Sequence, residues 1–501
     1  MHKWLLAALL AGALHGAVIR GSVVENQTGH PLSRASVLLE PVPGSPGVRM
    51  TAHTNQFGFF EFAGASPGTY LLQASRAAFV TALYGQKRWN SAGMPLIVSE
   101  SELQFLTIRM LRFGSIAGRV VDENDVGVPE FEVAAYLNTR PPQLVAKATS
   151  DDKGMYRIYG LLPGNYVVRT VGKQVDDIGY KPTYARETDL LDQARAVDVE
   201  IEQQVEMGNL QPLQGKSFTL TASVRAMDPI GMPVTMTFAS ETGRQIIHSD
   251  ADFVLRTFTG LPAGDYEVFG EAPSDTPLIQ GDFQRISIGR DSTIFLPMRK
   301  VPMVTFRFDG VSLQAANDGT VQVMARRKDL AGVYDARIIK GTSARLAPGR
   351  WELALAPLDG YYVSGFSGSG NYGFRRNQHV EGWNEITVTS NGGSARFTIS
   401  SNVSSLHGLV KDAGDPVVGA PVFLEPIDLE PERRVTFTYI ALTDTHGQYQ
   451  FAGLAPGRYR VLSSFEYQMP EAKIMENAGA KGVQLDPRAD VTRDLDLYVI
   501  R

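Results

Sequence analysis

A short phrase built around a turn glycine recurs in this chain and constrains its fold more than any other feature. In each copy a polar pair precedes the glycine, alternating large apolar and polar residues follow it, and a Pro-Gly pair then leads to a tyrosine. The copies run from Asn55 to Tyr70, from Asp152 to Tyr166 and from Thr445 to Tyr459. A repeated supersecondary unit decides the architecture of a chain, so the phrase predicts a tandem array.

The residues of the phrase predict a β-hairpin. After the turn, Phe60 and Phe62 alternate with Glu61, which is the period of a strand with one buried face. The Pro-Gly pair suits the two central positions of a tight turn, and the alternation resumes after it. The glycines before the first strand are expected at turn positions where φ is positive and a Cβ is unfavourable: Gly58, Gly154 and Gly447.

Two weaker copies complete a division into five repeats. Leu261 to Val268 keeps the glycine and the tyrosine, and Leu346 to Leu353 has Trp351 in place of the tyrosine, which predicts a core position for this tryptophan. The spacing of roughly 85 to 108 residues between copies is that of a complete small β-domain. We therefore expect a signal peptide at 1–17, followed by β-sandwich repeats 1 to 5 at 18–112, 113–212, 213–300, 301–400 and 401–501, of which repeats 3 and 4 are degenerate.

Three of the repeats also begin alike, with Gly21 to Val24, Gly118 to Asp122 and Gly408 to Asp412, each followed by a polar turn. Together with the phrase, these residues resemble the carboxypeptidase regulatory-like domain, which is related to the B-type repeats of collagen-binding adhesins and to the transthyretin-like prealbumin fold. The resemblance implies an exported bacterial multi-repeat protein. Its implied fold is all-β, a tandem array of antiparallel seven-stranded-type β-sandwiches with a prealbumin-like or carbohydrate-binding-like fold.

The first residues predict export. Lys3 precedes an apolar run from Trp4 to Leu14, which is typical of a secretory signal peptide and too short to span a bilayer. Cleavage near Ala17 would leave no transmembrane segment, so we expect a secreted, periplasmic or cell-surface protein. The absence of cysteine excludes disulfides and thiolate metal sites. A net charge of −5 argues against nucleic acid as a partner.

The motifs that could carry chemistry are weak, and we expect no enzyme, no cofactor and no metal site. A zinc peptidase needs His and Glu ligands close together, and the nearest approach, His379 with Glu381, has the wrong spacing. Asp122 begins a stretch like a calcium loop, but a hairpin turn explains it better. Kinship with adhesin repeats raises an isopeptide cross-link, for which Lys411 is plausibly placed, with a solvated side chain as the alternative.

Aromatic residues in predicted loops are the candidates for recognition. Trp89 with Tyr84, and Trp383 with Tyr372, lie in glycine-rich or polar stretches. Loops on a rigid sandwich often carry binding, and exposed rings can stack on sugars. A tryptophan that caps a hydrophobic edge is the competing interpretation.

Three hypotheses follow. The first is a non-catalytic scaffold, spacer or adhesion module, with a polysaccharide or a cell-surface protein as the expected partner. In an open series about five sandwiches would extend beyond roughly 100 Å, as in a stalk. The alternatives are a carbohydrate-binding protein that uses the loop aromatics, and an accessory subunit of a secreted enzyme or of an outer-membrane transport system.

Overall fold

We analysed a computed structural model of the chain. It describes residues 17–99, 103–139, 142–175, 178–226, 234–240, 243–249, 254–271, 279–281, 284–328, 336–370, 381–430, 433–436 and 438–500. The expected signal peptide, apart from Ala17, and the candidates Tyr372 and His379 lie outside the described residues.

Repeat 1 consists of two small sheets that share one core. One sheet has the order β4-β1-β8 and the other β3-β2-β5-β6, with β7 beside β5. Ile19 and Phe60 from the first sheet pack against Val37 and Tyr70 from the second. The strands are β1 (Ala17–Glu25), β2 (Ser36–Pro41), β3 (Met50–His53), β4 (Phe59–Ala65), β5 (Gly68–Ser75), β6 (Ala82–Leu83), β7 (Leu96–Val98) and β8 (Leu103–Met110).

Repeat 2 follows the same plan. Its sheets have the orders β12-β9-β17 and β11-β10-β13-β16, and a small hairpin, β14-β15, lies beside them. Tyr156 and Tyr166 lie in its core. Its elements are β9 (Gly114–Val120), β10 (Glu132–Leu137), β11 (Gln143–Thr149), β12 (Met155–Leu161), β13 (Gly164–Thr170), β14 (Lys173–Val175), β15 (Ile178–Tyr180), the 3-10 helix η1 (Leu191–Gln193), β16 (Ala196–Val199) and β17 (Gln204–Leu210).

In repeat 3 the strands join into one continuous sheet, because the short strand β23 pairs with both β22 and β25. The path of the sheet is β20-β19-β22-β23-β25-β18-β21, with β24 paired to β22. Its strands are β18 (Ser217–Ala226), β19 (Val234–Ser240), β20 (Gly243–Ser249), β21 (Val254–Pro262), β22 (Gly264–Glu271), β23 (Ile279–Gly281), β24 (Gln284–Ile288) and β25 (Ser292–Lys300).

Repeat 4 returns to two sheets, β29-β26-β33-β31 and β28-β27-β30-β32. Trp351 is buried in the core between them, as its position in the phrase predicts. Its elements are β26 (Met303–Asp309), α1 (Leu313–Asn317), β27 (Gln322–Arg327), β28 (Arg337–Lys340), β29 (Ser343–Arg345), β30 (Gly349–Leu355), β31 (Tyr362–Gly368), β32 (Asn384–Val388) and β33 (Gly393–Ser400).

Repeat 5 pairs β34 with β35, β38, β41 and β42 in one sheet and orders β37-β36-β39-β40 in the other. Its elements are β34 (Ser404–Asp412), β35 (Asp415–Pro416), β36 (Pro421–Pro426), β37 (Tyr439–Leu442), β38 (Gln448–Leu454), β39 (Gly457–Ser463), α2 (Ala472–Asn477), β40 (Lys481–Leu485), β41 (Asp490–Thr492) and β42 (Leu495–Asp496). The all-β fold of tandem sandwiches that the sequence predicts is confirmed.

The turn before each phrase strand has the predicted backbone. Gly58, Gly154 and Gly447 have φ values of 75°, 78° and 76°. In the second copy the Asp151 carboxylate accepts hydrogen bonds from the backbone N–H groups of Lys153 and Met155, which fixes the turn. Asn55 and Asp444 make the same pair of bonds in the other copies. These acidic or amide side chains therefore fix the three turns.

The aromatic residue after each Pro-Gly pair also has a fixed role. The hydroxyl groups of Tyr70, Tyr166 and Tyr459 each donate a 2.8 Å hydrogen bond to the carbonyl four residues earlier. The indole N–H of Trp351 donates the equivalent 2.8 Å bond to Ala347. The tryptophan thus replaces the tyrosine without loss of this bond.

One pairing departs from antiparallel order in every repeat. The first strand lies parallel to the last strand of the same repeat, as β1 does to β8 and β18 to β25. Corresponding parallel pairs occur in repeats 2 and 4, and in repeat 5 the first strand is parallel to both β41 and the last strand, β42. This contact joins the two ends of each repeat, so each sandwich is closed by its own chain ends.

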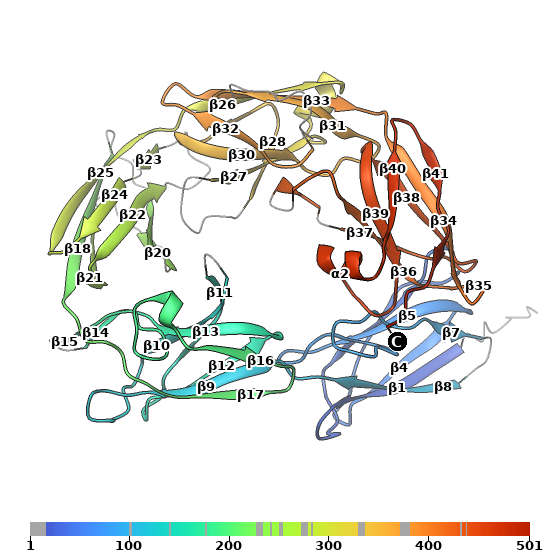
Figure 1. The fold of residues 1–501 in the computed structure, drawn as a ribbon, viewed down its shortest axis with the longest axis horizontal. Helices are drawn as coiled ribbons and strands as arrows, with labels where there is room; N and C mark the ends of the chain where they lie inside the picture. The colour runs from blue at the N-terminus through green and yellow to red at the C-terminus, as the bar shows by residue number, and fades with distance from the viewer. Residues whose placement is uncertain are drawn as a thin grey trace, which may run out of the picture.

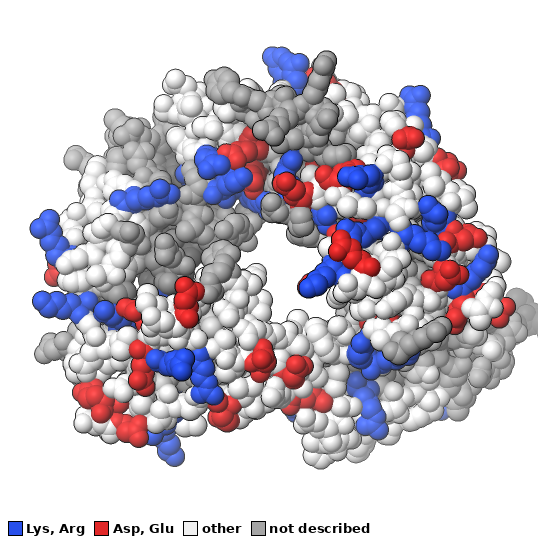
Figure 2. Space-filling model, in the orientation of Figure 1, with Lys and Arg blue, Asp and Glu red and all other residues white. Residues whose placement is uncertain are grey.

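The five repeats are arranged in a ring rather than in a line. In Figure 1 the chain passes around a central opening from β1 to the strands of repeat 5, which return beside repeat 1. The opening persists when side chains are drawn, and lysine, arginine and acidic side chains are visible on the molecule around it (Figure 2). The extended stalk is therefore not the arrangement observed, because the first and last repeats are in contact.

Candidate functional site

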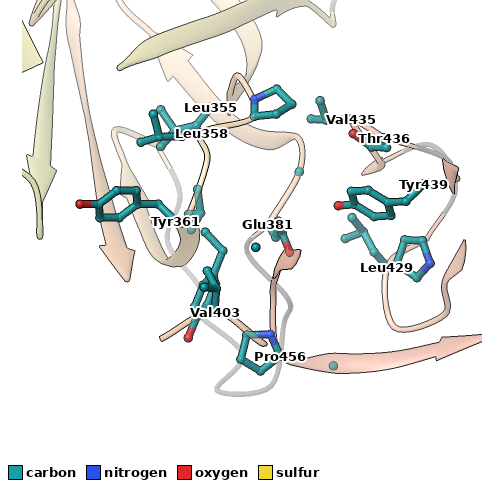
Figure 3. Close-up of a pocket in the computed structure, with 18 of the residues that line it drawn as sticks. Leu355, Leu358, Tyr361, Glu381, Val403, Leu429, Val435, Thr436, Tyr439 and Pro456 are labelled. Carbon is teal, nitrogen blue, oxygen red and sulfur yellow. The ribbon is translucent and has the colours of Figure 1, made fainter. Parts of the chain in front are cut away.

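A cavity of about 610 Å³ lies between repeats 4 and 5. Repeat 4 contributes the loop between β30 and β31, with Leu358, and the residues just before β32; repeat 5 contributes the connection after β36 and the turn between β38 and β39. Figure 3 shows Leu355 and Leu358 on one side of the cavity and Leu429 and Tyr439 on the other. The walls are mainly apolar, as is typical of small-molecule sites.

Glu381 is the unusual residue of this cavity. Its side chain lies between the two walls, and burial raises its pKa to about 7, since the carboxylate loses water without gaining a partner. Among the described residues, no hydrogen bond or ion pair reaches its carboxyl group. Glu381 can therefore take up or release a proton near neutral pH.

Two tyrosines and one ion pair also line the cavity. Burial is the main cause that raises the pKa of Tyr439 and of Tyr459 above the ordinary tyrosine value, with the Glu381 charge as a smaller cause. Arg458 contacts Asp428 at 2.5 Å, from Nε to Oδ1. Glu381 is thus the group in this wall that titrates near pH 7.

The residues next to Glu381 hold the two repeats together. The backbone N–H of Trp383 donates a 2.8 Å hydrogen bond to the carbonyl of Arg433, and the Arg433 side chain donates back to the carbonyl of Trp383. A Cβ on Gly382 would lie 2.2 Å from that Arg433 oxygen, so the close approach of the two chains requires glycine. The cavity is therefore framed by an ordered contact.

The structure corrects the expectation that Trp383 is an exposed sugar platform. It does lie in a loop, but only 7% of it is exposed, and the Arg326 guanidinium lies 4.3 Å from its ring centroid. The reason is that repeat 5 covers this loop through Arg433. Its proposed companion Tyr372 lies outside the described residues.

Tyr84 and Trp89 do lie together, in repeat 1. Both are half-buried and line a cavity of about 390 Å³ that also includes Lys87 and Arg88. Tyr84 packs partly against the core of repeat 1. Of the four predicted sugar-binding residues, Tyr84 and Trp89 therefore remain candidates.

The neighbouring residues form the contact that closes the ring, which we call the closure contact: 87–92 of repeat 1 with 465–468 of repeat 5. Lys87 and Arg88 lie 3.2 Å and 3.0 Å from the two carboxylate oxygens of Glu466. The Glu466 side chain is only 6% exposed, and these two cations compensate its loss of water.

Backbone and apolar contacts extend the closure contact. The N–H of Ala92 donates to the carbonyl of Phe465 at 2.8 Å, and the N–H of Gln468 donates to the carbonyl of Asn90 at 2.8 Å. Ala92 also packs against the core of repeat 5. Backbone hydrogen bonds and a shared core make this an ordered interface rather than a chance encounter of surface charges.

Two further sequence hypotheses can be placed. Lys411 lies at the surface, where its ammonium pairs with Asp494 at 3.3 Å, so it has the solvated position that we gave as the alternative to a cross-link. Asp122 accepts hydrogen bonds from the N–H groups of Asn124 and Val126, as expected for a hairpin turn.

Within the described ranges, no group of three or more His, Asp or Glu side chains could hold a metal ion. No helix among those residues is long and apolar enough to cross a membrane.

Comparison with known proteins supports the identity of the first repeat. Residues 18–89 match the model of the Carboxypeptidase regulatory-like domain, which confirms the resemblance predicted from the sequence. No curated protein sequence matches the chain.

Solved structures give fainter similarities. The minor pilin GBS52 of Streptococcus agalactiae is 16% identical, with 40% of this chain and 97% of that chain covered and a TM-score of 0.24. The shaft pilin spaA of Lactobacillus rhamnosus GG is 12% identical, with the same coverages and a TM-score of 0.24. The Bacillus anthracis TIE protein is 10% identical, with 93% of this chain and 68% of that chain covered and a TM-score of 0.16. Similarity at this level carries no information about activity or partners.

Sequence reasoning did not find Glu381 as a site residue or Glu466 at all. Glu381 drew attention only as a poor neighbour of His379, and Glu466 lies in a stretch without a motif. The groups around each of these two residues include residues of a second repeat, and a local sequence pattern does not predict contacts between repeats.

Proposed function

We propose that the protein is a non-catalytic exported scaffold whose five sandwiches form a closed ring. Repeats 1, 2, 4 and 5 each have a core of buried residues of their own, so these repeats serve as rigid units. A ring of rigid units holds its outer surfaces at fixed distances and angles, which suits the display or spacing of partners. A polysaccharide or a cell-surface protein is the partner class that we propose.

The observation that carries this proposal is the environment of Glu466. A carboxylate that is 6% exposed must be paired, and both of its cations come from the other end of the chain. Ala92, from the same segment of repeat 1, fills part of the core of repeat 5. The closure contact therefore favours the ring over an extended string.

Small-angle scattering on the purified mature chain tests this function. A closed ring gives a compact particle whose scattering fits the ring and whose maximum dimension stays well below that of five sandwiches in series. A rod-shaped particle with a maximum dimension well above roughly 100 Å would contradict the proposal and favour an extended stalk.

Carbohydrate binding is a second candidate function, because Tyr84 and Trp89 line one cavity. A glycan array of the wild type, of Trp89→Ala and of Tyr84→Ala tests it. The exposed Tyr159 of repeat 2 offers a control, Tyr159→Ala, which should bind as the wild type does. Binding that survives both cavity variants would remove this candidate.

A further inference from the structure

The cavity between repeats 4 and 5 has features that a scaffold does not need. Its volume of about 610 Å³ lies within the range of small-molecule sites, roughly 300 to 1,000 Å³. Leu358, Leu429 and Tyr439 give it apolar walls from both repeats. Two repeats that only needed to adhere would fill such a space with side chains, because protein interiors are close-packed.

The charges around the cavity favour a cation. The lining includes the acidic residues Asp359, Glu381 and Asp428 and the basic residue Arg458. Arg458 forms an ion pair with Asp428. Two further carboxyl groups line the cavity, that of Glu381 inside it and that of Asp359, which is an exposed residue. A carboxylate that loses much of its water without gaining a partner is costly, and a cationic group that entered the cavity would relieve that cost.

We propose that this cavity binds a small amphiphilic organic amine. Its ammonium group contacts the Glu381 carboxylate, and its hydrocarbon part packs against Leu358, Leu429 and Tyr439. The cavity lies away from the closure contact, so this site does not depend on the proposed scaffold function.

The site has a built-in pH dependence. With the pKa of Glu381 at about 7, about a tenth of the carboxyl groups are ionised at pH 6 and about nine tenths at pH 8. The other ionisable lining groups are Asp359, Asp428, Arg458 and the tyrosines Tyr361, Tyr362, Tyr439 and Tyr459, none of which belongs to a residue type that ordinarily titrates in this interval. Amine binding should therefore be several-fold tighter at pH 8 than at pH 6.

Isothermal titration calorimetry of the full chain with 2-phenylethylamine tests the site, with phenylacetate as the probe of opposite charge. We expect one amine per chain, an affinity five- to tenfold higher at pH 8 than at pH 6, and no binding of phenylacetate at pH 8. The isosteric variant Glu381→Gln should lose at least about tenfold in amine affinity at pH 8 and lose the pH dependence. Glu430→Gln removes the same charge from an exposed residue outside the lining and should bind as the wild type does.

Several results would overturn the proposal. They are no amine binding at millimolar concentration, equal amine affinity of wild type and Glu381→Gln, or tighter binding of phenylacetate than of the amine. Thermal unfolding of each variant verifies that the fold is intact. A wild-type affinity that is independent of pH would also contradict the role of Glu381, whatever the variants do. Small-angle scattering tests the ring separately, so failure of either proposal is distinguishable from failure of the other.

Discussion

Arg88 and Glu466 lie 378 residues apart in the chain, yet their side chains are 3.0 Å apart. Their ion pair joins the first sandwich to the last, and Lys87 adds a second cation to the same carboxylate. These ion pairs connect the two ends of the row of repeats and so close the ring. A substitution at one of these residues can therefore be used to open it.

Reversal of the charge at residue 466 should open the ring. Glu466→Lys places a third cation against Lys87 and Arg88, where like charges repel at short range. We expect a larger radius of gyration in small-angle scattering, with each sandwich still folded. Glu471→Lys, an equal charge change at a nearby exposed residue, should leave the radius unchanged. Equal radii for the two variants would show that the ion pairs do not hold the ring.

Gly154→Ala should destabilise repeat 2. The residue has φ of 78°, and an added Cβ would lie 2.3 Å from the carbonyl oxygen of Val120. The strain and the displaced strand should cost at least about 2 kcal/mol, seen as a lower Tm in calorimetry. Gly482→Ala is the matched control, because its Cβ would meet nothing within 4 Å. A Tm equal to that of the control would contradict the role assigned to the turn.

Tyr459→Phe should destabilise repeat 5 by about 1 to 2 kcal/mol, because the buried carbonyl of Ala455 loses its 2.8 Å hydrogen bond. Chemical denaturation measures the loss. Tyr159→Phe removes a hydroxyl from a residue that is 62% exposed and should have no effect. Indistinguishable unfolding of the two variants would mean that the bond after the Pro-Gly turn adds nothing.

Glu381→Gln should stabilise the protein at pH 8 and not at pH 4. The pKa of Glu381 is raised in the folded chain, so the folded state keeps a proton that the unfolded state releases, and stability falls as pH rises from about 4.5 to about 7. At pH 8 the gain from the variant should be about 2 kcal/mol, allowing for partial exposure. Calorimetry at the two pH values measures it, and a gain of the same size at pH 4 would contradict the assigned pKa.

The sequence was informative where structure depends on neighbours in the chain. The turns at Gly58, Gly154 and Gly447 were predicted because the glycine, the preceding polar residues and the strand that follows all lie within a few positions. The buried place of Trp351 followed from its alignment with the tyrosines. These relationships are between residues close together in the sequence, and each copy of the phrase provides an independent example of them.

Relationships between distant residues were not accessible in the same way. The parallel pairing of β1 with β8 depends on how the chain returns after about 80 residues. Trp383 is buried because Arg433 of the next repeat covers it, so its loop position misled the prediction of an exposed ring. The cavity around Glu381 and the closure contact likewise arise only when whole repeats pack together.

Disulfide trapping across the closure contact tests the ring most directly, since the natural chain contains no cysteine. The N–H of Gln468 donates a 2.8 Å hydrogen bond to the carbonyl of Asn90, so the backbones of the two residues are in direct contact. The double variant Asn90→Cys/Gln468→Cys should form an intramolecular disulfide under mild oxidation, seen as faster migration in a non-reducing gel, and neither single variant should do so. A double variant that stays reduced, or that forms only dimers, would contradict the closed ring.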